Sequence, residues 1–364
     1  MRTIIIIKSF EIDGEKMNDV NAVLQSAQEK HEHPLAKKRK VILLVLPIAL
    51  IVVSIASLMI GQVSFSVSEA IGGIFVNDDS LARRIVWDIR LPRVLLGIIV
   101  GMCLGAAGAI LQGVMQNPLA DPGVIGVTSG AGVMAVLIMV IFPGFILLLP
   151  LGAFLGAFIA SMLVYTLSWK GGTSPTRIIL VGVAINAICG AATSMMMILY
   201  SDRVQSVLPW LAGGITGAGW AQFRMIIMYA VIVLAICLYA IRHIRVMRLG
   251  DEMAKLLGHN VERSRLFLII LSTLLAGIAV SVAGLVGFVG LVVPHILRLI
   301  IGGDYRYLLP ASALGGGLLV VFADTIARSL FNPIEVPVGI LLAFLGGPYF
   351  LYLIHRKGNS FASN

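Results

Sequence analysis

The stretch RVLLGIIVGMCLGAAGAILQ at residues 93–112 decides the fold class. Its apolar residues follow one another without a period of 3.6 or 2, and about 20 such residues are what a helix needs to cross the hydrocarbon core of a membrane. Gly101, Gly105 and Gly108 lie on one face of this helix, where small residues let a neighbouring helix approach closely. The stretch therefore predicts a transmembrane helix that packs inside a bundle.

Nine further runs of the chain share this character. Hydrophobic residues make up 59% of the 364 positions and charged residues 12%, about half the charged share of a soluble domain. We expect an all-α integral membrane protein with ten transmembrane helices, of which the eighth is short and follows a turn near Gly284. The predicted spans are 41–60, 93–112, 124–142, 147–169, 178–199, 225–241, 266–283, 285–297, 308–327 and 338–354.

The net charge of +9 is explained by topology rather than by nucleic acid binding. With the N-terminus in the cytoplasm, 20 of the 27 Lys and Arg residues fall in cytoplasmic segments, which is the positive-inside pattern. Both termini are then cytoplasmic in a multi-pass membrane protein. Arg83, Arg84, Arg90 and Arg93 cluster on the opposite side, so we expect them to have a task there, with anchoring to lipid headgroups as the alternative.

Polar segments flank the membrane domain, which we place at 37–357. Residues 1–36 lack the apolar stretch and cleavage site of a signal peptide, and we interpret them as a cytoplasmic tail, helical over 18–30 and otherwise disordered. Residues 358–364 form a second cytoplasmic tail. A start at Met17 instead of Met1 is an alternative, because nothing in residues 1–16 has a structural purpose.

The chain lacks the residues that several kinds of function require. The chain has no Gly-x-x-x-x-Gly-Lys-Ser/Thr loop, so any ATP must be bound by a partner. The span centres carry no ionisable groups of the kind that ion-coupled transporters use, and Asp324 is expected to pair with Arg328 at i+4. His295 has no His or carboxylate at helical spacing, which disfavours a metal site. We therefore expect no enzyme activity, no metal and no cofactor.

Several strings in a fixed order resemble the iron-siderophore, haem and vitamin B12 permease family of ABC importers, the FecCD type. The similarity runs from about Val41 to the C-terminus. The strings are RLPR at 90–93, GAILQ at 108–112, NPLADP at 117–122, GVTSGA at 126–131, LVGVAIN at 180–186, WLAGG at 210–214, LG-x3-A-x2-LG at 249–258, GFVGLVVPH at 287–295 with Arg298, AD-x3-R at 323–328, EVPVG at 335–339 and GP at 347–348.

The resemblance implies one half of a permease dimer, whose second subunit is identical or related. It also implies two cytoplasmic ABC ATPases, an extracytoplasmic substrate-binding protein and contact with membrane lipid, but no nucleic acid. Transport would proceed by alternating access that the ATPase drives. We expect the cargo to be an iron(III)-siderophore complex, with haem or vitamin B12 as alternatives and an ion-coupled secondary transporter as the more distant one.

The resemblance also assigns roles to residues. Docking of the binding protein falls to Arg90, Arg93 and Arg328. The cytoplasmic gate comprises Asn117, Leu119, Pro175 and Thr176, although Asn and Pro at these positions could simply end helices. The translocation path includes Asn186, Ser194 and Met195 on the fifth span, with core packing as the other interpretation of the Met run at 195–197.

The loop at 244–264 is assigned to coupling with the ATPase. Residues 251–257 are expected to form a short helix, with acidic side chains at its N-terminal end and Gly258 as its C′ residue. The coupling residues are Asp251, Ala254, Leu256, Leu257 and Gly258. We expect Ala254 to leave space on the outer surface and the two leucines to enter a groove of the partner. The alternative is a helix on the membrane surface with the basic flanks Arg248, Arg263 and Arg265.

Overall fold

The computed structural model describes residues 14–76, 80–170, 172–330 and 335–361, and the regular structure in these ranges is helical throughout. The longer helices are α2 (Gly14–Met59), α5 (Leu91–Val114), α7 (Leu149–Leu167), α8 (Pro175–Leu199), α10 (Trp220–Met247), α12 (Val261–Ala283), α14 (Tyr305–Leu330) and α15 (Val338–Phe361). The shorter ones are α3 (Val67–Phe75), α4 (Leu81–Arg83), α6 (Val127–Val136), α9 (Val204–Ala212), α11 (Asp251–Leu256) and α13 (Val289–Ile301). Two π-helical segments, η2 (Arg84–Arg90) and η4 (Leu137–Ile141), and three 3₁₀ turns, η3 (Pro122–Ile125), η5 (Pro143–Leu148) and η6 (Ser201–Arg203), complete the set.

Among the described residues, seven helical stretches are long and apolar enough to cross a membrane, and three shorter apolar helices accompany them. The seven are Leu35–Met59, Leu81–Val114, Pro143–Leu167, Pro175–Leu199, Trp220–Met247, Val261–Ala283 and Tyr305–Leu330, and the three are Val127–Ile141, Val289–Ile301 and Val338–Tyr352. The all-α membrane fold is thus confirmed. Each of the ten predicted spans falls on one of these helices, but the number of crossings stays a prediction because three helices are short.

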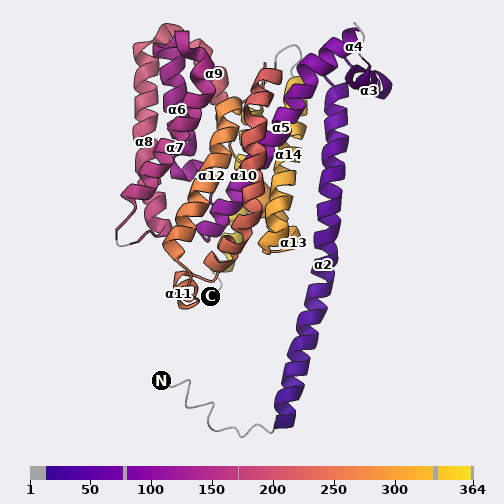
Figure 1. Ribbon diagram of the computed structural model, residues 1–364, viewed down its shortest axis with the longest axis vertical. Coiled ribbons are helices and arrows are strands. Elements are labelled where there is room, and N and C mark those ends of the chain that lie inside the picture. Colours follow the sequence, from indigo (N-terminus) through magenta and orange to yellow (C-terminus); the bar gives the residue numbers. More distant parts are fainter. Residues whose placement is uncertain (1–13, 77–79, 171, 331–334, 362–364) are drawn as a thin grey trace.

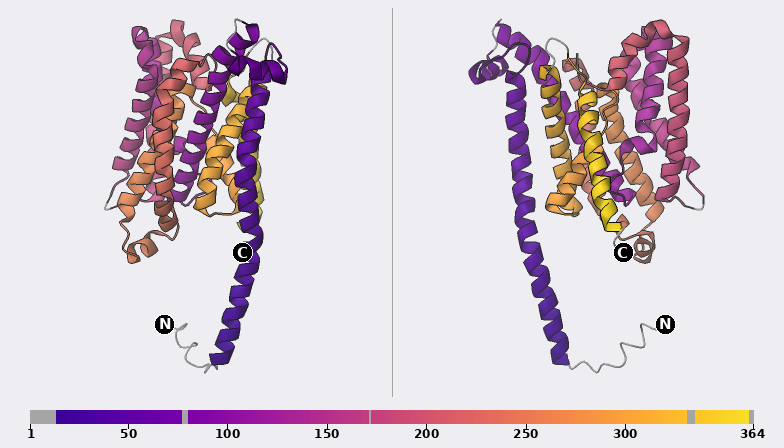
Figure 2. Two further views of the ribbon diagram at one scale, coloured as in Figure 1. Left: turned by 45° about the vertical axis from the view of Figure 1, so that its right-hand side comes forward. Right: turned by 180° about the vertical axis from the view of Figure 1, so that it is seen from behind.

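The helices differ greatly in how much of their surface the bundle covers. The most apolar window of the α5 span is 83% buried and that of α12 is 72% buried, whereas α8 reaches only 11% and α2 only 22%. Figures 1 and 2 show the same arrangement, with α2 along one flank, α8 along the opposite flank and α5, α12 and α14 between them. The two flanking helices therefore leave most of their apolar side chains free to meet lipid or another chain.

The glycine face predicted on α5 is where the central helices meet. A Cβ atom added to Gly101 would collide with the backbone of Gly316 on α14, and one added to Gly108 would collide with the backbone of Gly290 on α13. Only glycine permits these approaches, because any side chain would force the backbones apart. Helix packing, the interpretation favoured from the sequence for these glycines, is confirmed.

The turn predicted near Gly284 is also confirmed. Helix α12 ends at Ala283, and Gly284 has a φ of +63°, a left-handed value that glycine adopts without steric cost. The short helix α13 then begins at Val289 and is largely buried. Burial by neighbouring helices is what allows such a break at membrane depth, because the polar backbone groups of the turn avoid lipid.

The N-terminal segment differs from the sequence prediction. Residues 14–36, expected to be helical only over 18–30, continue without a break into the first span as the 46-residue helix α2, while residues 1–13 lie outside the described part. Adding a residue to an existing helix costs little once the first turn has formed. At 1.5 Å per residue α2 is about 69 Å long, so it extends well beyond the rest of the bundle (Figure 1). Likewise α15 runs to Phe361, into the segment predicted as the C-terminal tail.

The second span begins earlier than predicted, at Leu81 instead of residue 93. Pro92 lies within this continuous stretch and has no N–H to donate to the carbonyl four residues before it. The backbone accommodates the missing hydrogen bond by widening into the π-helical segment η2 directly before α5. The arginines at 83–93 thus belong to one helical stretch rather than to a loop.

Candidate functional site at the α11 end of the bundle

Helix α11 projects from one end of the bundle, between the ends of α10 and α12 (Figure 1). Gly250 and Gly258 flank it with φ values of +91° and +77°, and the backbone N–H of His259 donates to the carbonyl of Ala254 at 3.0 Å. This is the glycine-terminated helix end that the sequence predicted. The start of α2 and the end of α15 lie toward the same end of the molecule.

The side chains of α11 divide into a buried and an exposed set. Leu256 is 81% exposed and Leu257 is 60% exposed, so both present apolar surface outward. Ala254, by contrast, is fully buried against the bundle. The expectation that Ala254 faces outward to admit a partner is therefore wrong, because the helix turns that face toward α10 and α12.

A buried arginine holds α11 in place. The Nη2 of Arg265 donates to both carboxylate oxygens of Asp251, at 2.7 and 2.8 Å, and such charge-assisted hydrogen bonds are stronger than neutral ones. Arg265 is fully buried, so it is not available as a basic flank of a membrane-surface helix, the role that the alternative gave it. Asp251 thus anchors α11 to α12.

The same guanidinium reaches the segment that precedes α8. Its Nη1 donates to the carbonyl and, at 3.1 Å, to the hydroxyl of Thr173. Glu262 completes the group, since its carboxylate accepts from the backbone N–H and the hydroxyl of Thr173 at 3.1 and 2.7 Å. We call Asp251, Thr173, Glu262 and Arg265 the Arg265 cluster. It connects α11, α12 and the segment before α8 through side chains.

The Arg265 cluster was not predicted from the sequence. Arg265 stands next to the apolar run 266–283, which was a signal that its side chain could point into the bundle. Of its partners only Glu262 lies at helical spacing, three positions before it, while Asp251 and Thr173 lie 14 and 92 positions away. The pairing with Asp251 and Thr173 therefore follows only from the packing of three elements.

The predicted gate residues lie in two separate segments. The side-chain oxygen of Asn117 accepts from the backbone N–H of Leu119 at 2.9 Å, which closes a tight turn after α5. Pro175 is the first residue of α8, after the N-cap Ser174, and Thr176 is exposed. Pro175 begins a helix, so helix punctuation, the alternative interpretation, applies to it. Asn117 lies in the turn beyond α5, which ends at Val114. A gating role for these residues stays a prediction.

The predicted path residues on α8 have different environments. The side-chain oxygen of Asn186 accepts from the Ser129 hydroxyl at 2.5 Å, and its Nδ2 donates to the carbonyl of Gly123 at 3.0 Å, so this amide ties α8 to η3 and α6. Ser194 is exposed and Met195 is 63% exposed, on the uncovered side of the helix. The other two methionines of the run pack against a small core cluster.

The predicted docking arginines lie at the opposite end of the bundle. The guanidinium of Arg93 forms a bidentate pair with Asp324, at 2.9 and 3.0 Å, and donates to Glu335 at 2.8 Å. Arg328 donates to the hydroxyl of Ser57 at 2.8 Å and to its carbonyl. The predicted pairing of Asp324 with Arg328 is therefore wrong: within the described residues Asp324 pairs with Arg93, on another helix.

Arg90 is likewise used inside the chain. Its Nη1 donates to the carbonyls of Leu58 and Met59, at 2.6 and 3.1 Å, and its Nη2 donates to the carbonyl of Val63. Arg90, Arg93 and Arg328 are all buried. They join the ends of α2, α5 and α14, a structural role that was not predicted from the sequence.

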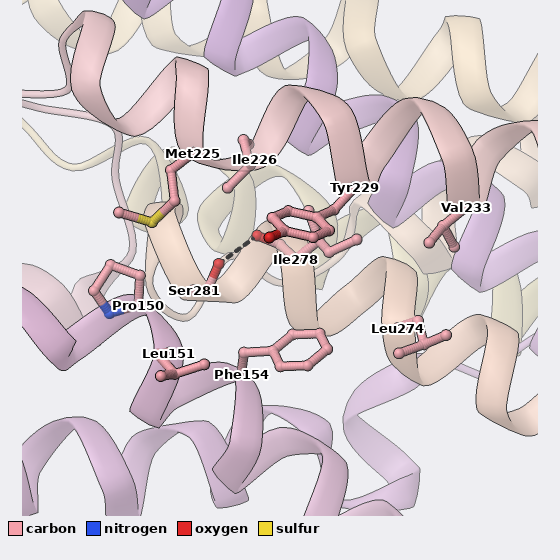
Figure 3. A pocket seen from close by; sticks show the side chains of 10 residues that line it. All are labelled: Pro150, Leu151, Phe154, Met225, Ile226, Tyr229, Val233, Leu274, Ile278 and Ser281. Atoms are coloured by element: carbon pink, nitrogen blue, oxygen red, sulfur yellow. Dashed lines mark hydrogen bonds between the residues drawn. The ribbon is translucent and has the colours of Figure 1, made fainter.

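Two further features bear on the chemistry available. Among the described residues no group of three or more His, Cys, Asp or Glu side chains could hold a metal ion. An apolar pocket of about 400 Å³ lies between α7, α10 and α12 (Figure 3). Its lining carries no ionisable group apart from the Tyr229 phenol, and the Ser281 hydroxyl donates to the carbonyl of Ile278 at 2.8 Å. Such a pocket suits hydrocarbon and not a charged chelate.

Comparison with known proteins identifies close relatives over nearly the whole chain. The model of the FecCD transport family matches residues 49–356. The chain is 39% identical to the Fe(3+)-citrate import system permease protein YfmE of Bacillus subtilis (strain 168), over 91% of this chain and 98% of the relative. It is 41% identical to the hemin transport system permease protein HmuU of Yersinia pestis, over 85% of this chain and 94% of the relative.

A solved structure has the same fold. It is described as an inward-facing conformation of a metal-chelate type ABC transporter, and it superimposes with a TM-score of 0.78 at 30% sequence identity. The match covers 86% of this chain and 99% of the solved one. The similarity therefore extends over the bundle as a whole and includes both ends described above.

Proposed function

Because the chain belongs to the FecCD transport family, whose members are permease subunits of ABC importers, we propose that it moves an iron(III)-siderophore complex across the bacterial cytoplasmic membrane. Transport is by alternating access, and the chain itself performs no covalent chemistry. ATP hydrolysis belongs to a separate ABC ATPase, and an extracytoplasmic binding protein delivers the cargo.

All ten apolar helices cross the membrane in this proposal, and both termini are cytoplasmic. An even number of crossings agrees with the location of the start of α2 and the end of α15 toward one end of the bundle. The excess of Lys and Arg in the segments at that end supports its cytoplasmic orientation. Helix α11 is then on the cytoplasmic side, where an ATPase can reach it.

The uncovered side of α8 lines the translocation path together with a second permease subunit, identical or related. Ser194 and Met195 lie on this side, and small residues such as Gly190 and Ala191 are exposed with them. Methionine gives an adaptable surface that binds many shapes weakly. Asn186 takes a different part, since its amide holds α8 against η3 and α6. The gate at the cytoplasmic end comprises Asn117, Leu119, Pro175 and Thr176.

The observation that carries the proposal is the combination of exposure and anchoring at α11. Leu256 and Leu257 offer an apolar surface to the ATPase, while Asp251 and Ala254 hold the helix to the bundle. A helix that only rested on the membrane would not need an ion pair to a buried arginine of the bundle. The anchor allows a displacement of α11 to act on Thr173, two residues before Pro175 at the start of α8.

Docking of the binding protein is assigned to the opposite end, around Arg90, Arg93 and Arg328. Their burial changes how docking would work, because carboxylates of the binding protein would have to compete with Asp324 and Glu335 for Arg93. Glu335 is the more accessible of the two carboxylates. Docking would therefore re-pair an existing ion-pair network instead of adding new pairs to free arginines.

Uptake into liposomes tests the function and the cargo together. The full chain is reconstituted with the ATPase and the binding protein made alongside it, and uptake of a radiolabelled iron(III) siderophore, haem or vitamin B12 is measured with ATP inside. We expect uptake of the siderophore only, and only with ATP. Preferred uptake of haem or vitamin B12 would reassign the cargo within the family, and uptake driven by an ion gradient without ATP would refute the importer mechanism.

A further inference from the structure

A groove of about 480 Å³ lies where α2, α13 and α14 meet. On α2 it is lined by Ile42, Leu46, Ala49 and Val53, which recur on one face of the helix, and Ile296 and Phe322 contribute to the far wall. From Ile42 to Val53 the helix rises about 16 Å. One leaflet of a bilayer has a hydrocarbon thickness of about 15 Å. The length of the groove along α2 therefore matches the hydrocarbon thickness of one leaflet.

Basic residues surround one end of this groove. The sequence KKRK occupies residues 37–40, directly before Ile42. Lys38 and Arg39 lie at i−4 and i−3 from Ile42, so they share the helix face that lines the groove. Arg39 is held by the carbonyl of Ile301 at 3.0 Å and by Asp304 at 3.8 Å, which places the basic cluster at the mouth between α2 and α13.

The three lysines of this cluster keep their charge available. Lys37, Lys38 and Lys40 are exposed, and in the part of the chain that the structure describes no carboxylate forms an ion pair with them. Several basic residues beside the membrane end of a helix attract anionic lipids, and each contributes about 1 kcal/mol, or a factor of about 5 in affinity. The cluster thus complements a negatively charged headgroup.

We propose that the groove between α2 and the α13–α14 pair binds an anionic phospholipid. One acyl chain fills the groove over the length of one leaflet, and the headgroup phosphate contacts Lys38 and Arg39, which share the groove face. Lys37 and Lys40, on neighbouring faces of α2, add to the positive potential around the headgroup. A protein helix fits less well, because the groove offers no polar side chain that would set the register of a partner. The lipid adds to the direct contacts that hold α2 to the bundle, such as the hydrogen bonds from Arg39 to Ile301 and from Thr325 to Ser57. This site is independent of the transported cargo.

Native mass spectrometry of the full-length chain in detergent tests the site. Phosphatidylglycerol and phosphatidylcholine with the same acyl chains are titrated separately, and the bound adducts are counted. We expect one phosphatidylglycerol to bind more tightly than phosphatidylcholine. The triple substitution Lys37→Gln, Lys38→Gln and Lys40→Gln should lower the affinity for phosphatidylglycerol by about 100-fold, since the three lysines act together. It should leave the affinity for phosphatidylcholine unchanged.

Matched variants separate a headgroup site from general surface charge. The control variant Lys170→Gln, Arg242→Gln and Arg245→Gln removes the same charge from exposed positions at the same end of the molecule. It should still bind one phosphatidylglycerol tightly. Ala49→Phe, or Ile296→Trp on the opposite wall if the first variant unfolds, should block the groove and displace both lipids. Equal binding of the two lipids, equal loss in both charge variants, or retention of the lipid by both groove variants would each overturn the proposal.

Discussion

Arg265 is the residue whose role changes most between sequence and structure. In the sequence it is one of several basic residues of a loop, and in the structure it is a fully buried side chain that connects α11, α12 and the segment before α8. A buried guanidinium is stable only with its partners in place, because an unpaired buried charge is costly. The buried position of the Arg265 side chain therefore depends on Asp251 and Thr173 together.

The first prediction concerns this anchor. Asp251→Asn leaves one side of the buried guanidinium without a carboxylate, which should destabilise the attachment of α11 by about 1 to 3 kcal/mol. ATP hydrolysis by the assembled transporter should continue, but cargo uptake per ATP should fall because motion of α11 no longer reaches Thr173. The measurement is the ratio of uptake to ATP hydrolysis in liposomes. The matched control is Glu252→Gln, at an exposed neighbouring carboxylate, and an unchanged ratio in Asp251→Asn would contradict the transmission role.

The second prediction concerns Arg93. Arg93→Gln leaves Asp324 and Glu335 without their guanidinium, and breaking a buried ion pair typically costs about 3 to 5 kcal/mol. The thermal unfolding midpoint of the purified chain should therefore drop. Arg224→Gln, which changes an exposed arginine at the start of α10, should leave the midpoint unchanged.

A double variant separates structure from docking at Arg93. Replacing both Arg93 and Asp324 with Leu should restore part of the lost stability, because an apolar pair avoids the buried unpaired charge. If Arg93→Gln instead lowers only the affinity for the binding protein and leaves the unfolding midpoint unchanged, Arg93 is a docking residue with little structural role.

At the level of elements, α11 illustrates how one short helix can serve two surfaces. The six residues of α11 carry an anchor, a buried alanine and an apolar edge, and Leu257 extends that edge into the following turn. The third prediction is that Leu256→Ser with Leu257→Ser abolishes co-purification of the ATPase. Burying one leucine contributes about 1.5 to 3 kcal/mol, so losing two should reduce affinity by more than 100-fold while the permease itself stays folded.

Ala254→Arg provides the contrasting variant for α11. Because Ala254 is buried, this substitution should destabilise the chain itself and lower its unfolding midpoint. Full retention of the ATPase by the double leucine variant would favour the alternative of a helix on the membrane surface, which would instead lose its attachment to lipid.

At the level of the whole molecule, the contrast between covered and uncovered helices predicts where a second subunit and a water-filled path lie. The fourth prediction is that Ser194→Cys on α8, in a Cys189→Ser background, reacts with a membrane-impermeant maleimide in the assembled transporter. Thiols react as thiolates, which need water. Ile48→Cys on the outward side of α2, where the side chain is 53% exposed, should stay unreactive because it faces lipid. Equal reactivity at the two positions would mean that α8 lines no aqueous path.

The sequence alone determined the features that depend on composition and on local backbone chemistry. Long apolar runs must become membrane helices because lipid cannot satisfy free backbone groups, so the location of α5, α8 and α12 followed from residues 93–112, 178–199 and 266–283. Glycine at 258 and 284 marked helix ends for the same local reason, since few other residues adopt those backbone angles.

Only the tertiary structure decided which side chains meet. Arg93 pairs with Asp324 across 231 positions instead of leaving Asp324 to Arg328 one turn away, and Arg265 binds Thr173 across 92 positions. Ala254 turned inward for a similar reason, as α11 is oriented by its anchor and not by its own sequence. Inside a membrane bundle, polar side chains must satisfy each other wherever the packing of helices brings them together, and that packing is a property of the whole chain.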